Sequence, residues 1–136
     1  PEGCARAIAH CIADAGLNPE DIGYINAHGT GTIANDRTET AALKLVLGQA
    51  TGDVWVSSTK SMHGHALGGT AAMEFVLATQ AVRSGIMPPT INMTEPDPEC
   101  DLRHVENQAV EVKIDVALSN SFAFGGLNAV LAIRRV

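Results

Sequence analysis

The stretch Ser-Ser-Thr-Lys-Ser-Met-His-Gly-His-Ala-Leu-Gly-Gly-Thr-Ala-Ala-Met-Glu-Phe, residues 57–75, decides the fold. It begins as a polar loop that carries Lys60, His63 and His65, and it continues into a helix of small residues. An ammonium and two imidazoles so close together, followed by an apolar helix, predict a loop that delivers hydrogen-bond donors into a buried pocket. The alternative is an ordinary surface turn with two solvated histidines, and this stretch alone leaves both open.

The helix that follows this loop is predicted over residues 67–83, with Gly85 at its end. The surrounding segment 66–82 is the most apolar part of the chain, yet it contains Glu74 and many small residues. These features predict a helix buried in the core of the domain, and they argue against a membrane span.

The composition indicates one globular domain or half of one. The chain has 136 residues, of which 46% are hydrophobic and 18% are charged, which is enough to bury a core. A formal net charge of -6, with nine scattered Lys and Arg residues, argues against nucleic-acid binding, because affinity for phosphate backbones comes from clustered basic residues.

The cysteine pattern points to a reducing compartment. Cys4, Cys11 and Cys100 are odd in number and fit no CxxC or metal-ligand spacing, so we expect reduced thiols, no metal site and a cytoplasmic protein. No apolar run with a basic start opens the chain, so no signal peptide is expected. The chain begins at Pro1, directly in helix pattern, which suggests a piece of a longer protein.

Hydrophobic periodicity predicts an α/β fold in which helices cover a sheet. An irregular excursion is expected over 90–107, and the last two strands are expected to pair in antiparallel fashion. Asn35 or Asp36 is the predicted cap of the second helix. The predicted helices are 2–15, 35–47 and 67–83, and the predicted strand regions are 22–27, 54–57, 110–114, 117–119 and 129–133.

Three strand-end loops carry residues whose side chains could bind a ligand or catalyse a reaction. Loops at one end of a sheet can converge on one pocket. Two imidazoles aimed at one point can donate hydrogen bonds to a carbonyl oxygen that gains negative charge, as in an enolate or a thioester oxyanion. The three groups are His28 with Thr30 and Thr32, Lys60 with His65, and Phe124 with Gly125 and Gly126.

Each of the other residues in these loops could have a functional role or a purely structural one. Gly125 and Gly126 let the backbone approach a ligand, so that a main-chain N–H there could line an oxyanion hole, or they form a simple turn. Lys60 could pair with Glu39 or Asp36, or it could be solvated. The two threonines could bind an amide-bearing ligand or only close the turn.

The three motifs together resemble one family. His-Gly-Thr-Gly-Thr at 28–32, Lys-Ser-Met-His-Gly-His at 60–65 and Asn-Ser-Phe-Ala-Phe-Gly-Gly-Leu-Asn at 120–128 resemble the C-terminal half of a β-ketoacyl-[acyl-carrier-protein] synthase of the thiolase fold. The segments 88–92 and 96–102 resemble its elongating, type II branch. The resemblance implies a mixed sheet of about four to five strands covered by helices, in a single domain over residues 1–136.

The resemblance implies a decarboxylative Claisen condensation between an acyl group on a cysteine and a malonyl thioester. His28 and His65 would donate to the malonyl thioester oxygen, and Lys60, held by Glu39, would support His65. Phe124 would gate the pocket, and its N–H would complete the oxyanion hole. Thr30 and Thr32 would contact the phosphopantetheine arm of acyl carrier protein, which carries the substrates, and no cofactor is expected to be bound.

The nucleophilic cysteine of the family belongs to the N-terminal half, which this chain lacks. The resemblance therefore implies an inactive fragment whose partners are that N-terminal half, acyl carrier protein and a second copy in a homodimer. Ala123 and Leu127 depart from the usual glycine and threonine, which leaves chain-length preference open, and His63 is set aside as non-catalytic. The sequence around residues 35–40 is similar to that of nodulation-type synthases.

Two alternatives to a condensing enzyme are considered. A degradative thiolase would carry a second cysteine in its last glycine loop, and residues 124–126 contain none. A non-catalytic partner of the chain-length-factor type would be expected to have lost the site, yet both histidines and Lys60 are present.

Overall fold

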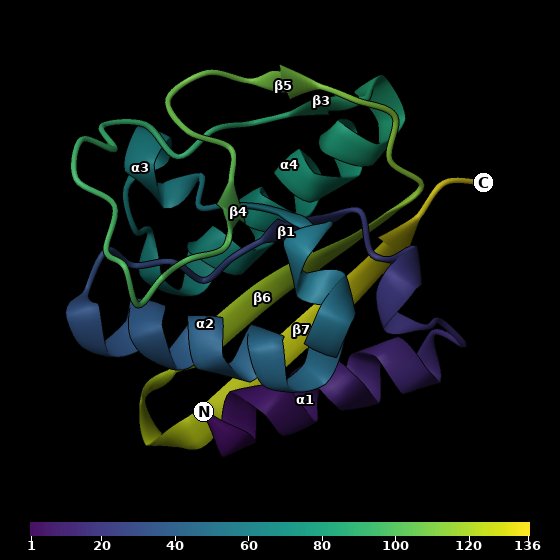
Figure 1. Ribbon diagram of the computed structural model, residues 1–136, viewed down its shortest axis with the longest axis horizontal. Helices are drawn as coiled ribbons and strands as arrows, with labels where there is room; N and C mark the ends of the chain where they lie inside the picture. Colours follow the sequence, from purple (N-terminus) through teal and green to yellow (C-terminus); the bar gives the residue numbers. More distant parts are fainter.

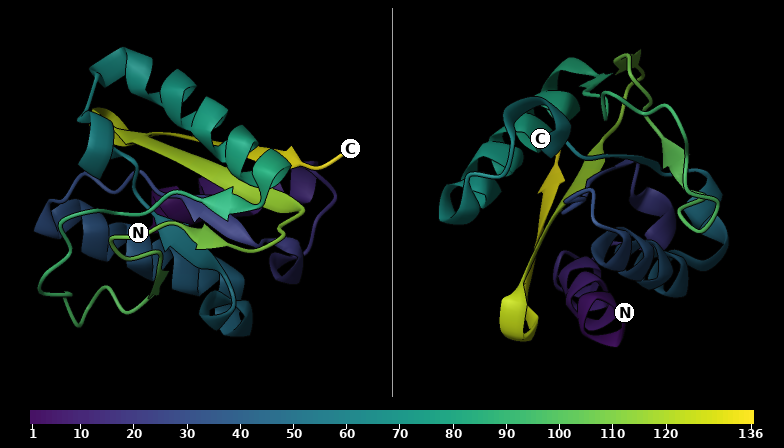
Figure 2. Two further views of the ribbon diagram at one scale, coloured as in Figure 1. Left: turned by 90° about the horizontal axis from the view of Figure 1, so that it is seen from above. Right: turned by 90° about the vertical axis from the view of Figure 1, so that its left-hand side faces the viewer.

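The computed structural model describes residues 1–136 as a main sheet with helices on both faces and a second, two-stranded sheet. Helices α1 (Glu2–Asp14) and α2 (Ile33–Leu47) cover one face, and α4 (Thr70–Ser84) covers the other (Figures 1 and 2). A single-turn helix, α3 (Lys60–His63), precedes α4. The prediction of an α/β fold with helices over a sheet is confirmed.

The main sheet has five strands in the order β4-β2-β1-β6-β7. The first four run parallel, and the last two form the expected antiparallel hairpin. A separate pair, β3 (Ile86–Met87) with β5 (Val110–Glu111), lies beside it. The five strands are β1 (Tyr24–Asn26), β2 (Trp55–Ser57), β4 (Arg103–His104), β6 (Val116–Ala123) and β7 (Leu127–Arg134).

Two hydrophobic cores lie on the two faces of the sheet. The core under α1 and α2 includes Ile8, Leu43 and Leu118, and α1 contributes to it because Ala5, Ile8 and Ile12 recur on one helical face. The smaller core under α4 includes Val82 and Met87. Burial of these side chains supplies most of the folding free energy, at about 25 cal/mol per Å² of apolar surface.

Four details of the predicted elements are corrected. Helix α2 begins after Thr32, whose hydroxyl accepts a hydrogen bond from the Asn35 N–H at 3.4 Å, so Thr32 and neither Asn35 nor Asp36 is the cap. Strand β6 continues to Ala123 and shortens the last loop to residues 124–126. The excursion 90–107 contains β4, and the alternating segment 110–114 forms only the two-residue strand β5.

Helix α4 is not the buried core helix that the sequence predicts. It ends at Gly85, in the left-handed conformation as expected (φ 73°), but it buries only Thr70, Glu74, Ala78, Ala81 and Val82. Its outer face exposes Met73, Phe75 and Val76, the last at 56%. The helix is apolar on two sides, and this chain covers one of them.

No helix combines the length and the apolar composition that a bilayer crossing requires.

The outer face of α4 generates a prediction about the isolated chain. We expect the 136-residue chain to self-associate through this face, because a contiguous exposed apolar surface favours association. Replacing Met73 and Val76 together by glutamate should shift the chain toward monomer in sedimentation velocity. Leu45→Glu is the matched control, since Leu45 is more exposed than either residue, at 68%, but lies on α2. A wild-type chain that is monomeric at high micromolar concentration would contradict the prediction.

Candidate active site

Two histidines face each other beyond the carboxyl ends of two neighbouring parallel strands. His28 follows β1 by two residues, and His65 follows β2 and the short helix α3. The ring centroids are 5.8 Å apart, and the ring planes are inclined by 84°. The ring of Phe122, on β6, lies 5.9 Å from His28. The structure therefore brings the first two predicted loops together, at the sheet edge where α/β folds bind their ligands.

The environment of His28 keeps its imidazole neutral at physiological pH. Burial lowers the pKa of His28 to about 4, with further lowering by the charges of Lys60 and His65. Loss of solvation and a nearby cation both disfavour imidazolium. A neutral imidazole carries one N–H, so His28 can donate one hydrogen bond without introducing a charge.

The hydrogen bonds of His65 select its tautomer. The backbone N–H of Leu67 donates to His65 Nδ1 at 3.1 Å, and the hydroxyl of Thr70 lies 3.0 Å from the same nitrogen. Because Nδ1 accepts, the proton of a neutral ring resides on Nε2. His65 therefore presents an Nε2–H donor, and no group of this chain accepts from it.

Lys60 is buried at the centre of the site and makes two short hydrogen bonds. Its Nζ donates to Glu74 Oε1 at 2.6 Å and to the carbonyl oxygen of His28 at 2.5 Å. The predicted pairing of Lys60 with Glu39 or Asp36 is wrong, and its partner is the carboxylate of α4. Burial raises the pKa of Glu74, and the ion pair with Lys60 opposes that shift.

Glu39 is unavailable to Lys60 because backbone and amide donors occupy both of its oxygens. The N–H groups of His28 and Gly29 donate to Oε1 and Oε2, each at 2.9 Å, and Asn120 Nδ2 donates to Oε1 at 3.0 Å. Glu39 thus ties the loop after β1 to α2 and β6. Asp36, the other proposed supporter, accepts from the side chain of Asn35 at 3.0 Å and does not reach Lys60.

The loop after β1 requires glycine where it passes β2. Gly29 has φ +38°, and a Cβ at this position would lie 2.5 Å from Cβ of Ser58, so a larger residue would clash as well as strain the backbone. Further along, the hydroxyls of Thr30 and Thr32 lie 3.0 Å apart at the surface. They are therefore exposed to a ligand that approaches from solvent.

The third predicted loop does not join the histidines in this chain. Phe124 is fully exposed at the tip of the β6–β7 hairpin, and Gly125 and Gly126 have φ values of +77° and +80°. In Figure 1 this tip lies beside the N-terminal end of α1. The motif reaches the site only through Phe122, whose ring packs near His28, and through Asn120.

Glu74, Asn120 and Phe122 are site residues that sequence reasoning missed. Glu74 was visible as a single carboxylate in an apolar helix, which is a signal for a buried ion pair. Asn120 and Phe122 were assigned to a loop, and their place in β6 is what directs them toward Glu39 and His28.

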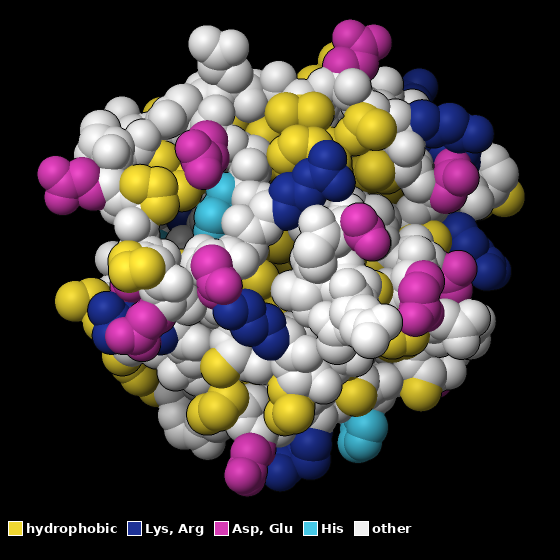
Figure 3. All heavy atoms as spheres, in the orientation of Figure 1, with side chains coloured by type: hydrophobic (Ala, Val, Ile, Leu, Met, Phe, Trp, Pro, Cys, Tyr) yellow, Lys and Arg dark blue, Asp and Glu magenta, His cyan; other side chains and the backbone are white.

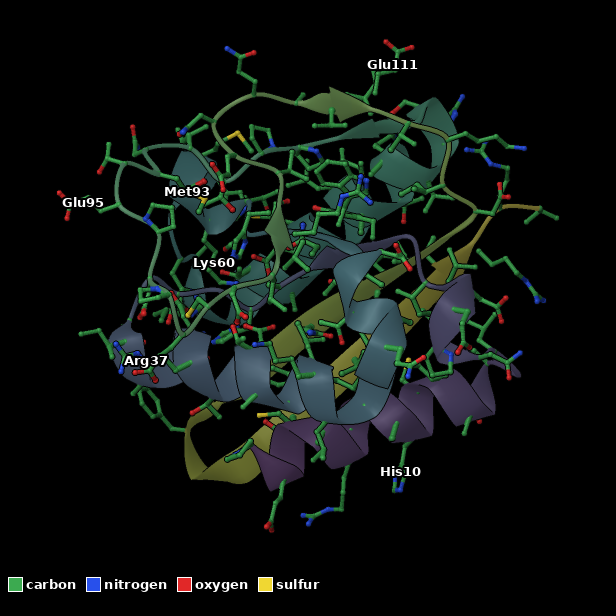
Figure 4. All side chains as sticks on the ribbon, in the orientation of Figure 1. His10, Arg37, Lys60, Met93, Glu95 and Glu111 are labelled. Atoms are coloured by element: carbon green, nitrogen blue, oxygen red, sulfur yellow. The ribbon has the colours of Figure 1, made fainter.

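A cavity of about 640 Å³ adjoins Lys60 and His65 under the segment 90–102. Arg37 holds this segment against α2 through ion pairs to Asp97 and Glu99, each at 2.9 Å. The face seen in Figure 3 is hollowed beside a histidine side chain. Figure 4 shows Lys60 inside the molecule and Arg37 at its outer edge. The site is therefore open to solvent-borne ligands from this side.

Comparison with known proteins places the chain in a family. The family described as beta-ketoacyl synthase, C-terminal domain, matches residues 1–94. Nodulation protein E of Rhizobium sp. (strain N33) is 55% identical over 99% of this chain and 34% of that protein. The 3-oxoacyl-[acyl-carrier-protein] synthase 2 of Synechocystis sp. is 53% identical over 98% of this chain and 32% of that protein.

Ketosynthases are among the solved structures that resemble this chain. One is the AntDE:AntF complex, a type II polyketide synthase acyl-carrier protein with its ketosynthase bound to the hexaketide. It matches with a TM-score of 0.95 and 39% identity, over 98% of this chain and 33% of that chain. The chain thus spans about a third of the length of its relatives. It belongs to the β-ketoacyl synthase family, whose C-terminal domain it contains.

Proposed function

We propose that this chain is the C-terminal part of a β-ketoacyl-[acyl-carrier-protein] synthase and supplies the decarboxylating half of its active site. The observation that carries the proposal is the pair of facing imidazoles, His28 and His65, with ring centroids 5.8 Å apart. Two preorganised N–H donors suit a carbonyl oxygen that becomes an oxyanion, and such donors are worth several kcal/mol in a dry site.

The proposed reaction begins with loss of CO₂ from a malonyl thioester. His28 and His65 donate to the thioester oxygen and stabilise the enolate left when the carbon–carboxylate bond breaks. The enolate carbon then attacks the acyl thioester on a cysteine, a carbon–carbon bond forms, and the cysteine thiolate leaves. Lys60 holds the His28 carbonyl and so fixes the ring in place. These steps would serve fatty-acid or specialised acyl-chain synthesis.

The remaining predicted residues have supporting roles in this proposal. Thr30 and Thr32, exposed at the surface, would contact the phosphopantetheine arm. Phe124, Gly125 and Gly126 would close over the acyl group, with the Phe124 N–H as an oxyanion donor, once the rest of the protein packs against the hairpin tip. Glu39 holds the loop that carries His28, and Asp36 lies in the first turn of the same helix, α2.

The nucleophile would come from outside this chain. Burial raises the pKa of all three cysteine thiols, Cys4, Cys11 and Cys100, which lowers their thiolate fraction and their reactivity. None of them contacts His28 or His65. The missing N-terminal part would therefore supply the cysteine, and the chain alone would not condense substrates. The three thiols are unpaired, which suits the reducing cytoplasm.

The exposed face of α4 supports an N-terminal half as partner. Met73, Phe75 and Val76 form an apolar surface beside the site, and a second half packed there would both cover it and bring the nucleophile toward His28. Acyl carrier protein and a second copy of the enzyme are the other proposed partners. One similar structure contains a ketosynthase with its acyl-carrier protein.

A chain-length-factor-type partner protein is the second candidate, and the intact site disfavours it. Lys60, Glu74 and Glu39 form a buried polar arrangement that costs folding free energy unless it is fully paired. Its presence around the two facing histidines suits a working enzyme. The residue at the nucleophile position of the complete protein distinguishes the two.

The histidine pair generates a prediction for the complete protein. His28→Ala and His65→Ala should each lower malonyl decarboxylation by about 100-fold or more, the usual effect of removing one oxyanion donor. Acylation of the nucleophile should stay within a few-fold of wild type. Both steps can be followed by mass spectrometry of the carrier and the enzyme. Decarboxylation at the wild-type rate in either variant would sink the proposal, and His10→Ala, exposed on α1, is the control.

The neutral state of His28 generates a prediction about pH. Its pKa of about 4 lies below the value of 6.5 for a free imidazole, so between these values the unfolded chain binds a proton that the native chain does not. Stability from this residue is therefore complete above pH 6.5 and is lost as pH falls toward 4. Ring resonances of His28 should titrate near pH 4 in NMR, and titration near 6.5 would contradict this.

The Lys60–Glu74 pair generates a prediction about stability. Lys60→Met should lower the free energy of unfolding by about 3–5 kcal/mol, because it leaves the carboxylate buried and unpaired. Adding Glu74→Leu should recover more than half of that loss, since an apolar pair needs no compensation. Urea unfolding of the complete protein measures both. A Lys60→Met variant as stable as wild type would show that the pair is solvated.

A further inference from the structure

His63 lies at the end of α3 with one nitrogen bonded and the other buried without a partner. Its Nε2 is 3.1 Å from the hydroxyl oxygen of Thr59, and its Nδ1 has no hydrogen-bond partner. An unpaired buried polar atom costs folding free energy, which an apolar or hydroxyl side chain at this position would avoid. A side chain with this cost points to a role beyond filling space.

Thr59 connects His63 to the strand that presents His28. Its hydroxyl oxygen, fully buried, accepts a hydrogen bond from Asn26 Nδ2 at 3.2 Å. Asn26 is the last residue of β1, two positions before His28. A continuous chain of hydrogen-bonded groups therefore runs from the imidazole of His63 to the end of the strand from which His28 projects.

His63 also lies beside the buried ion pair. Lys60 and His63 are three residues apart on one helical turn, so their side chains share a face. The pKa of Glu74, which burial raises, is lowered by Lys60 and also by His63 and His65. His63 therefore shares a helical turn with Lys60, which donates to the His28 carbonyl, and it is linked through Thr59 to the Asn26 amide.

We propose that His63 is a positioning residue for the decarboxylation step, which fixes His28 by bracing Thr59 and the Asn26 amide. This inference rests on the proposed function, because it assigns His63 to the reaction that His28 serves. His63 touches no reacting atom. Its loss should therefore slow the chemical step without weakening substrate binding.

The test uses the complete enzyme with malonyl thioester on its carrier. His63→Leu keeps most of the volume but cannot bond Thr59, and it should lower kcat for decarboxylation by about threefold to tenfold, as for one lost hydrogen bond. The KM should stay within about twofold of wild type. His63→Gln places an amide nitrogen near the position of Nε2 and should restore kcat to within about twofold. Wild-type kcat in the leucine variant would overturn the proposal.

A double-mutant cycle separates bracing from a local structural effect. Thr59→Val breaks the same chain at its next link, so His63→Leu combined with Thr59→Val should slow decarboxylation no more than the worse single variant. Multiplicative losses would overturn the proposal. His10→Leu, at the histidine that points away from the molecule in Figure 4, controls for loss of an imidazole.

Two further measurements keep the test decisive. If the leucine variant does not fold, His63→Asn takes its place, because its shorter amide cannot reach Thr59. If the wild-type enzyme does not decarboxylate malonyl thioester, the proposed function fails, and NMR then tests the bracing by itself. His63→Leu should shift the Asn26 side-chain amide and the His28 ring resonances. Unchanged resonances would overturn the proposal.

Discussion

The buried ammonium of Lys60 is the interaction on which the site depends. An unpaired charge in this position would lower the free energy of unfolding by several kcal/mol. Lys60 therefore pairs with Glu74 from α4 and donates to the carbonyl of His28 in the loop after β1. That requirement joins two segments far apart in the sequence. It also places a positive charge beside His28, which together with burial keeps the imidazole neutral.

A second carboxylate, Glu39, performs the matching task for the backbone. It gathers the N–H groups of His28 and Gly29 and the amide of Asn120 around one buried group. The loop after β1 can therefore leave the sheet without unsatisfied donors, which are rare in folded proteins. The two carboxylates have different roles. Glu74 neutralises the charge of Lys60, and Glu39 fixes the backbone of the loop after β1.

The uneven burial of α4 connects packing with function. One side of the helix completes the smaller core, and the other carries Met73, Phe75 and Val76 to solvent. The same helix provides Glu74 to Lys60, so whatever packs on its outer face lies next to the ion pair. The chain spans about a third of the length of its relatives, and the N-terminal half proposed above is the partner that would cover this surface.

The sequence by itself determined the family and the positions of the three long helices, and it singled out His28, Lys60 and His65 as candidate site residues, because short motifs and hydrophobic periodicity are local properties of the chain. It also indicated the antiparallel ending of the sheet. Only the tertiary structure decided that Lys60 pairs with Glu74 and not with Glu39, that α4 has an uncovered face, and that Phe124 lies apart from the histidines. The physical reason is that pairing of buried charges depends on which side chains the packed sheet and helices bring within hydrogen-bond distance, and sequence separation carries no record of that distance.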